Sequence, residues 1–116
     1  MRLLTLVFGS FFTVVGTLHF VRPAFFVRQV PPYVPHPAAA VLLTGVAEVA
    51  IGLALIADWQ PSLAGAGAAA LITSYLPVHI EVFRSASTPA ARRREALRFP
   101  VNAVYVAIAM LVAIGR

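Results

Sequence analysis

The sequence predicts an all-α fold, a four-helix transmembrane bundle that forms one domain over residues 1–116. Of the 116 residues, 60% are hydrophobic and 11% are charged, whereas an ordinary soluble domain is about 45–50% apolar and about 25% charged. The mean hydropathy is +0.89, and the apolar residues are gathered in four long runs. Too little polar sequence is left to cover the surface of a soluble domain, so the composition favours a membrane protein.

The four apolar runs cover residues 3–21, 38–57, 62–83 and 99–115. Each has about 17–22 residues, which is the length that a helix needs to cross the hydrocarbon core of a bilayer. Because lipid offers no partners to backbone amides and carbonyls, each run is expected to be helical. No small-residue cleavage site follows the first run. We therefore expect it to be a retained membrane anchor, not a cleaved signal peptide.

Three segments connect the runs. Residues 58–61 (Asp-Trp-Gln-Pro) form a tight polar turn, with Trp59 at the depth of the lipid headgroups. Residues 84–98 form a longer polar loop, in which residues 85–89 offer capping side chains to a short surface helix over residues 90–96. Residues 22–37, called here the proline-rich segment, hold five prolines interleaved with three aromatic residues. Prolines forbid a long helix, so this segment is expected to lie at headgroup level or to fold back over the bundle.

The charged residues indicate an orientation in the membrane. The chain has nine Arg, no Lys and four acids, a net charge of +5. Four crossings place both termini on one side, with Arg2 and Arg116, and place seven Arg on the other side. By the positive-inside rule, both termini face outward and the Arg-bearing loops face the cytoplasm of a bacterial inner membrane. The triplet Arg92–Arg94 is then a topology signal that contacts anionic lipid, and no nucleic-acid partner is expected.

Glu48 lies at the middle of the second run. A central acid costs about 2.5–3.5 kcal/mol of insertion free energy, which nine strongly apolar residues between positions 41 and 56 offset by roughly 3–5 kcal/mol. Glu48 should therefore be protonated or paired. Gly45 and Gly52 lie three residues before and four after it and permit close approach of another helix, so Glu48 is expected to face the bundle interior. Gly9, Gly16 and residues 64–70 are further close-packing surfaces.

Polar residues of the other three runs fall at depths near the cytoplasmic side. Together with Glu48 they are the candidates for ligand binding or proton relay: His19, Glu48, Tyr75, His79, Asn102 and Tyr105. Arg98, Asn102 and Tyr105 share one helix face, as do Tyr75 and His79. Pro77 removes a backbone hydrogen bond from the third run, and the resulting kink should open space beside Tyr75 and His79.

Each candidate also has a purely structural interpretation. A buried Glu–His–Asn–Tyr network can simply fix helix packing and register. His19, taken alone, fits an interfacial residue whose ring reaches toward the headgroups, and His36 fits a solvated loop. His19, Glu48, His79 and Glu81 are conceivable metal ligands, but no helix has the usual ligand spacing, so we expect no metal. Because cysteine is absent, disulfides and thiolate sites are excluded.

The sequence resembles the DoxX-like family of small bacterial membrane proteins over most of its length. The similar segments are residues 16–20 (Gly-Thr-Leu-His-Phe), Pro23, Phe25-Phe26, residues 30–37 (Val-Pro-Pro-Tyr-Val-Pro-His-Pro) and residues 44–48 (Thr-Gly-Val-Ala-Glu). The third helix of the family often shows Phe-Pro-Ala-Asn, where this chain has Leu76-Pro77-Val78-His79. The fourth often begins Arg-x-Pro-x-Gln, where this chain has Arg98-Phe99-Pro100-Val101-Asn102. The resemblance implies a four-helix transmembrane bundle.

The name-giving relatives are linked to thiosulfate:quinone oxidoreduction as the membrane subunit, so the resemblance implies a quinone-linked redox role. Such a subunit would not be an autonomous enzyme. The chain has no cysteine, haem or flavin motif, so electrons would come from a redox partner protein. Two other functions remain open: a small proton-coupled transporter, which would have to work as a homo-oligomer, and a non-catalytic membrane scaffold.

Overall fold

The computed structural model describes residues 2–115 and confirms the all-α fold. Its seven helices are α1 (Arg2–Val21), α2 (Pro23–Val27), α3 (Pro37–Ile56), α4 (Pro61–Ser74), α5 (Leu76–Arg84), α6 (Pro89–Ala96) and α7 (Arg98–Ile114). Four helical stretches are long and apolar enough to cross a membrane: α1, α3, α4 with α5, and α6 with α7. The chain is thus a multi-pass membrane protein. Arg116, which the orientation count uses, lies outside the described residues.

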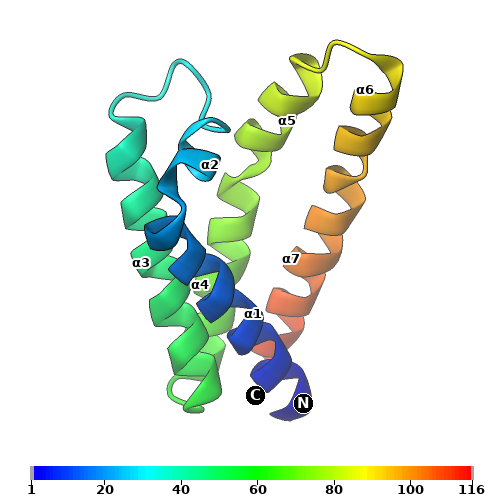
Figure 1. The fold of residues 1–116 in the computed structure, drawn as a ribbon. Coiled ribbons are helices and arrows are strands. Elements are labelled where there is room, and N and C mark those ends of the chain that lie inside the picture. The colour runs from blue at the N-terminus through cyan, green and yellow to red at the C-terminus, as the bar shows by residue number, and fades with distance from the viewer. Residues whose placement is uncertain (1, 116) are drawn as a thin grey trace.

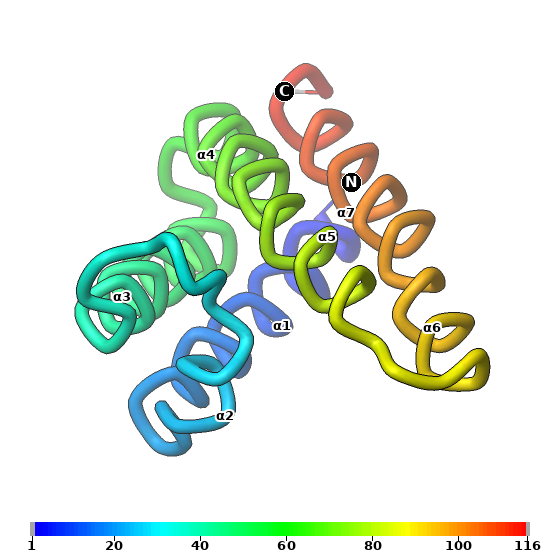
Figure 2. Tube along the Cα trace, turned by 90° about the horizontal axis from the view of Figure 1, so that it is seen from above, coloured from blue at the N-terminus to red at the C-terminus, as the bar shows by residue number. Residues whose placement is uncertain are grey.

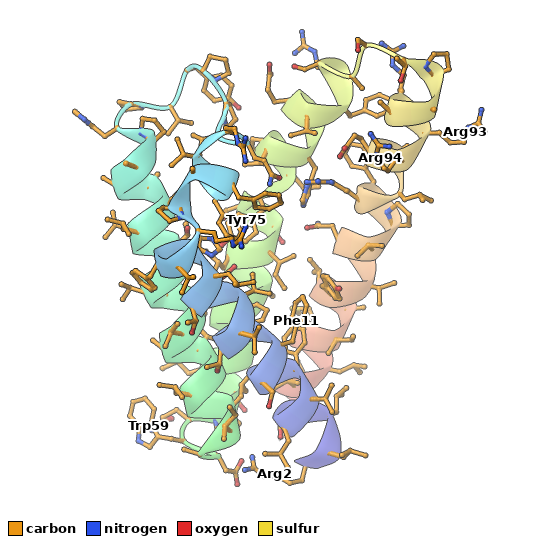
Figure 3. The ribbon with its side chains drawn as sticks, in the orientation of Figure 1. Arg2, Phe11, Trp59, Tyr75, Arg93 and Arg94 are labelled. Atoms are coloured by element: carbon orange, nitrogen blue, oxygen red, sulfur yellow. The ribbon has the colours of Figure 1, made fainter. Side chains whose placement is uncertain are left out.

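The bundle has two ends of different character. α1 begins and α7 ends beside the α3–α4 turn, at what we call the terminal end (Figure 1). The proline-rich segment and the loop between α5 and α7 lie at the opposite, Arg-rich end. Figure 3 shows Arg2 and Trp59 at the terminal end and Arg93 and Arg94 at the Arg-rich end. This arrangement is the one that four crossings predict.

Glycine residues allow two pairs of helices to pack with their backbones in close contact. A Cβ atom on Gly9 would lie 2.8 Å from the Gly52 carbonyl oxygen, and one on Gly16 would lie 2.9 Å from the Glu48 Cβ, so α1 and α3 touch along their backbones. Gly65 brings the backbones of α4 and α7 together, since a Cβ atom on it would lie 2.7 Å from the Ala113 backbone nitrogen. Such close approach is what small residues provide in membrane helices. The predicted packing role of Gly9 and Gly16 is confirmed.

The hydrophobic core lies near the terminal end. It is formed by residues from the first half of α1, from the length of α4 and from the ends of α3 and α7, among them Phe8, Phe12, Leu55, Ala68, Ile72 and Val112. Toward the Arg-rich end the helices spread, and α5 and α6 stand away from α2 and α3 (Figures 1 and 2). The spread leaves room for a site in that half of the bundle.

The turn between α3 and α4 is closed by the backbone and by Arg2. The Trp59 amide donates to the Ala54 carbonyl at 2.8 Å, and Asp58 takes the left-handed conformation that ends such helices. The Arg2 guanidinium donates to the carbonyls of Leu55, at 2.8 Å, and Ile56, and lies 3.8 Å from the Asp58 carboxylate. Arg2 thus satisfies carbonyls that the end of α3 leaves without partners.

The third crossing differs from the expected continuous run over residues 62–83. It breaks at Tyr75, between α4 and α5. The Tyr75 amide donates to Ile72 at 3.1 Å in a tightened turn, and the His79 amide donates to the Tyr75 carbonyl at 3.1 Å. Pro77 lies in the first turn of α5, where its missing N–H costs little. The predicted distortion is confirmed, and it amounts to a full break.

The loop before the last crossing forms the expected surface helix. α6 begins after Thr88, whose hydroxyl accepts a hydrogen bond from the Ala91 amide at 3.0 Å. This is the capping role predicted for residues 85–89. α7 begins at Arg98 and ends at Ile114, within one residue of the predicted bounds of 99–115.

Candidate functional site

A cavity of about 420 Å³ lies in the spread half of the bundle. Its wall combines apolar side chains from α1, α2, α3 and α5 with a smaller polar set. The polar set consists of His19, Gln29, Thr44, Glu48, Ser74, Tyr75, His79 and Arg98. Figure 3 shows Tyr75 in this half of the bundle, nearer than Phe11 to the Arg-rich end. Four of the six residues predicted for the site, which are His19, Glu48, Tyr75 and His79, therefore share one cavity.

Glu48 is 4% exposed and faces the interior, as expected. The Tyr75 hydroxyl donates a hydrogen bond of 2.7 Å to Glu48 Oε1, and the Thr44 hydroxyl lies beside that of Tyr75. The other carboxylate oxygen, Oε2, is buried and has no hydrogen-bond partner among residues 2–115. The Nδ1 atom of His19 lies 3.5 Å from it. One oxygen of this intramembrane acid is thus available to a bound molecule.

His19 is buried, so the interpretation of a ring that reaches toward the headgroups is wrong. The side chain is 5% exposed. Its Nδ1 lies 2.8 Å from the Val15 carbonyl and therefore donates to it, and its ring stacks on Phe26 with 3.8 Å between the ring centres. The burial has two causes. Gly45 admits the His19 Cβ against α3, and α2 turns back immediately after α1 and covers the ring.

His79 lies on the opposite side of the cavity, on α5. It is half-buried, and its Nδ1 is buried without a hydrogen-bond partner in the described chain. Asn102 and Arg98 of α7 are its polar neighbours. Asn102 is 6% exposed but does not line the cavity, so it supports His79 from behind.

Tyr105 lies outside the site in which the sequence analysis places it. It does not line the cavity; its ring packs on Phe11, 5.3 Å between centres, and against the hydrophobic core. Tyr105 shares a helix face with Asn102, but it lies one turn nearer to the terminal end, where the bundle is closed. Depth along the helix, which the sequence gives only coarsely, therefore separates it from the site.

Phe26, Gln29 and Arg98 are among the cavity residues that sequence reasoning missed. Phe26 and Gln29 come from the proline-rich segment, which folds back over the bundle as one of its two expected arrangements. Arg98 was assigned only to topology and to a helix face, yet it lines the cavity and donates to Gln29 Oε1 at 2.8 Å. The aromatic residues between prolines were a signal for Phe26. No local pattern marks Gln29.

His36 and Glu81, which the sequence analysis also discusses, lie outside the cavity. His36 is exposed at the start of α3, as expected, where it takes a left-handed conformation. Glu81 lines a second pocket, away from His19 and Glu48. Within residues 2–115, no group of three or more His, Asp or Glu side chains is placed to hold a metal ion.

Comparison with known proteins places the chain in a family. No curated protein and no solved structure shows significant similarity to it. The resemblance to the DoxX-like family therefore stays a prediction. One family model, described as "Domain of unknown function (DUF8561)", matches residues 8–113 and thus spans all four crossings. The chain belongs to this DUF8561 family.

Proposed function

We propose that the protein binds a lipophilic molecule with a polar ring, of the quinone class, in the intramembrane cavity. The observation that carries the proposal is a pair of buried polar atoms, Glu48 Oε2 and His79 Nδ1, that have no hydrogen-bond partner among residues 2–115. Both residues line the same cavity. Leaving such groups unpaired costs free energy. A ligand that bonds to both atoms recovers it.

The cavity suits such a ligand in size and chemistry. Its volume of about 420 Å³ falls in the range of small-molecule sites, about 300–1,000 Å³. Phe25, Phe26 and Val41 provide apolar walls for a ring and its tail. Quinone carbonyls need hydrogen-bond donors, which His79 and Arg98 can supply, and quinone reduction consumes protons, which Glu48 or His79 can relay. Since the sequence offers no cysteine and no haem or flavin motif, the electrons would come from a partner protein.

The proposal places the protein as a membrane subunit of a redox system, and the resemblance to the DoxX-like family supports the same role. Transport is the second candidate, because a buried, incompletely paired acid is also what a proton-coupled carrier uses. A scaffold is the third, in which the same network only fixes packing. These three functions predict different outcomes for the same set of variants.

The test is ligand retention in native lipid. The protein is extracted with its surrounding membrane, and co-purifying small molecules are identified by mass spectrometry. Wild type is expected to retain a quinone, and Glu48→Gln and His79→Ala are each expected to lose at least about 90% of it, since losing one buried hydrogen bond costs about 1–3 kcal/mol, on the order of tenfold in affinity. Tyr105→Phe, outside the cavity, is the control and should retain it.

Other results would contradict the proposal. If no molecule co-purifies and both variants only unfold at lower temperature, the cluster is structural. If solute drives proton movement in proteoliposomes and Glu48→Gln abolishes it, the function is transport.

We also propose that the protein lies in the bacterial inner membrane with both termini outside. The Arg-rich end carries seven of the nine arginines in the sequence, including the exposed Arg93 and Arg94, and cytoplasmic loops are enriched in Arg and Lys. A reporter that is active only outside the cytoplasm, fused after Arg116, should be active. The same reporter inserted at Ser87, between α5 and α6, should be silent. Activity at Ser87 and silence after Arg116 would reverse the assignment.

A further inference from the structure

A second pocket, of about 450 Å³, lies at the Arg-rich end between the proline-rich segment and helices α5 and α6. We call it the outer pocket and the intramembrane cavity the inner one. The outer pocket is more polar than the inner one, with Arg28, Glu81, Ser85, Ser87 and Glu95 in its wall. Charged side chains of this kind, at the loop end of a membrane bundle, favour contact with water.

One thin wall separates the two pockets. Gln29 and Val30 line both of them. Arg98 lines only the inner pocket and Glu95 only the outer one, and their ion pair, 2.6 Å between Arg98 Nε and Glu95 Oε2, crosses the wall. The Arg98 guanidinium also donates to Gln29 Oε1 at 2.8 Å. The side chains of Gln29, Glu95 and Arg98 therefore form a barrier between the two pockets.

Gln29 is the part of this barrier that comes from the proline-rich segment. It lies just after α2, outside the regular helices. Its amide nitrogen makes one long bond, 3.4 Å, to the Phe25 carbonyl. Its side-chain carbonyl oxygen accepts a hydrogen bond from Arg98, which joins the proline-rich segment to α7. On the inner side of the barrier lies His79, with Arg98 and Glu95 as charged neighbours. Glu48 lines the same inner pocket.

We propose that the outer pocket is the water entrance of the buried site and that the Gln29 side chain is its movable wall. When Gln29 leaves Arg98, water from the Arg-rich side reaches the inner pocket, and Glu48 and His79 exchange protons with that side alone. The use of these protons rests on the proposed function. The entrance itself does not, because it follows from the two pockets and their common wall.

Cysteine accessibility tests the entrance. The chain contains no cysteine, so each introduced thiol is the single reactive one. Thr44→Cys places a thiol in the inner pocket, and Ser87→Cys places one in the outer pocket. The reagent is membrane-impermeant methanethiosulfonate ethylsulfonate, added to one side of vesicles of known orientation. Both thiols are expected to react from the Arg-rich side and not from the other.

Thr17→Cys is the matched control. Thr17 is exposed on the outer face of α1, four residues from the end of that helix at Val21, whereas Thr44 lies seven residues inside α3, which begins at Pro37. Thr17 thus lies nearer to the Arg-rich end but faces lipid, where a charged reagent does not go. It is expected to stay unlabelled. Ser62→Cys, exposed at the terminal end, should react from the opposite side only.

The movable wall is tested by Gln29→Ala in the Thr44→Cys background. Loss of the bond to Arg98 is expected to raise the labelling rate at position 44 about tenfold, with the rate at Ser87→Cys unchanged. An unchanged rate at position 44 would refute the role of Gln29. No labelling of position 44 from the Arg-rich side, while Ser87→Cys reacts, would refute the entrance. Should Thr44→Cys fail to fold, Val78→Cys, also in the inner wall, replaces it.

The two proposals can fail separately. Labelling reads water access and does not require a ligand, whereas mass spectrometry reads ligand retention and does not require an entrance. Side-specific labelling without any retained molecule would refute the quinone proposal and leave the entrance in place. A retained quinone together with an unreactive thiol at position 44 would refute the entrance and leave the quinone proposal in place.

Discussion

Replacing Gly52 with alanine is expected to lower the free energy of unfolding by about 1–3 kcal/mol, because overpacking a tight contact forces backbone shifts. An added Cβ would lie 2.7 Å from both the Gly9 carbonyl oxygen and the Thr13 backbone nitrogen, and it would also overlap the Thr13 hydroxyl. Backbone atoms cannot turn aside as a flexible side chain can. α1 would have to move away from α3, and these two helices form the most extensive contact in the bundle.

Gly67→Ala is the matched control for this prediction. Gly67 also lies in a membrane-spanning helix, but its added Cβ would meet only the Ile51 side chain, at 3.5 Å, an ordinary contact. Alanine has the higher helix propensity, so this variant should be unchanged or up to about 1 kcal/mol more stable. Thermal unfolding in lipid nanodiscs, followed by circular dichroism, measures both. Equal stability of the two variants would contradict the backbone contact of α1 with α3.

The fold was predictable because the bilayer allows few alternatives. Apolar runs of spanning length must be helical in lipid, and glycines at Gly9, Gly16 and Gly52 mark where helices touch. The exact helix ends were less predictable. The break at Tyr75 depends on how Pro77 and the preceding turn share their hydrogen bonds, and a proline alone is compatible with a kink or with a break.

The site was predictable only in part. The residues that were predicted correctly are those whose depth in the bilayer can be counted from the loops. Glu48, His19 and His79 share a depth on helices that cross the bilayer, so counting residues from the loops brought them together. Tyr105 lies one turn too deep, where the core closes. Gln29 enters the cavity from a segment whose path is set by proline turns and not by a helical period. Periodicity therefore gave no information about it.

The pairing of Glu48 with Tyr75 permits a separation of stability from ligand binding. Tyr75→Phe leaves Glu48 Oε1 without its 2.7 Å hydrogen bond, and Glu48→Leu leaves the Tyr75 hydroxyl without its acceptor. Either single change removes the main hydrogen-bond partner of a polar group inside the bundle. Relative to the double variant, which lacks both groups, each single variant should therefore have a free energy of unfolding lower by about 1–3 kcal/mol. Thermal unfolding and ligand retention are measured on the same samples.

The double variant Glu48→Leu/Tyr75→Phe is expected to be at least as stable as wild type. It removes both partners together, and it replaces an acid that costs about 2.5–3.5 kcal/mol at the membrane centre with a residue that favours insertion by about 0.3–0.6 kcal/mol. The same variant should retain no quinone, because the carboxylate oxygen that faces the ligand is gone. Glu48→Leu combined with Tyr105→Phe is the control, and its effects on stability should add within about 0.5 kcal/mol.

A stable but empty double variant would show that the buried acid is kept for binding and not for folding. A network that only fixes helix packing predicts a different result: the double variant would lose both its stability and its uniform structure, since nothing else would hold Tyr75 and the end of α4 in place. A double variant that is stable and still retains quinone would contradict the role assigned to Glu48 in the proposed function. The insertion cost of Glu48 would then be offset by ligand binding and not by a gain in folding stability.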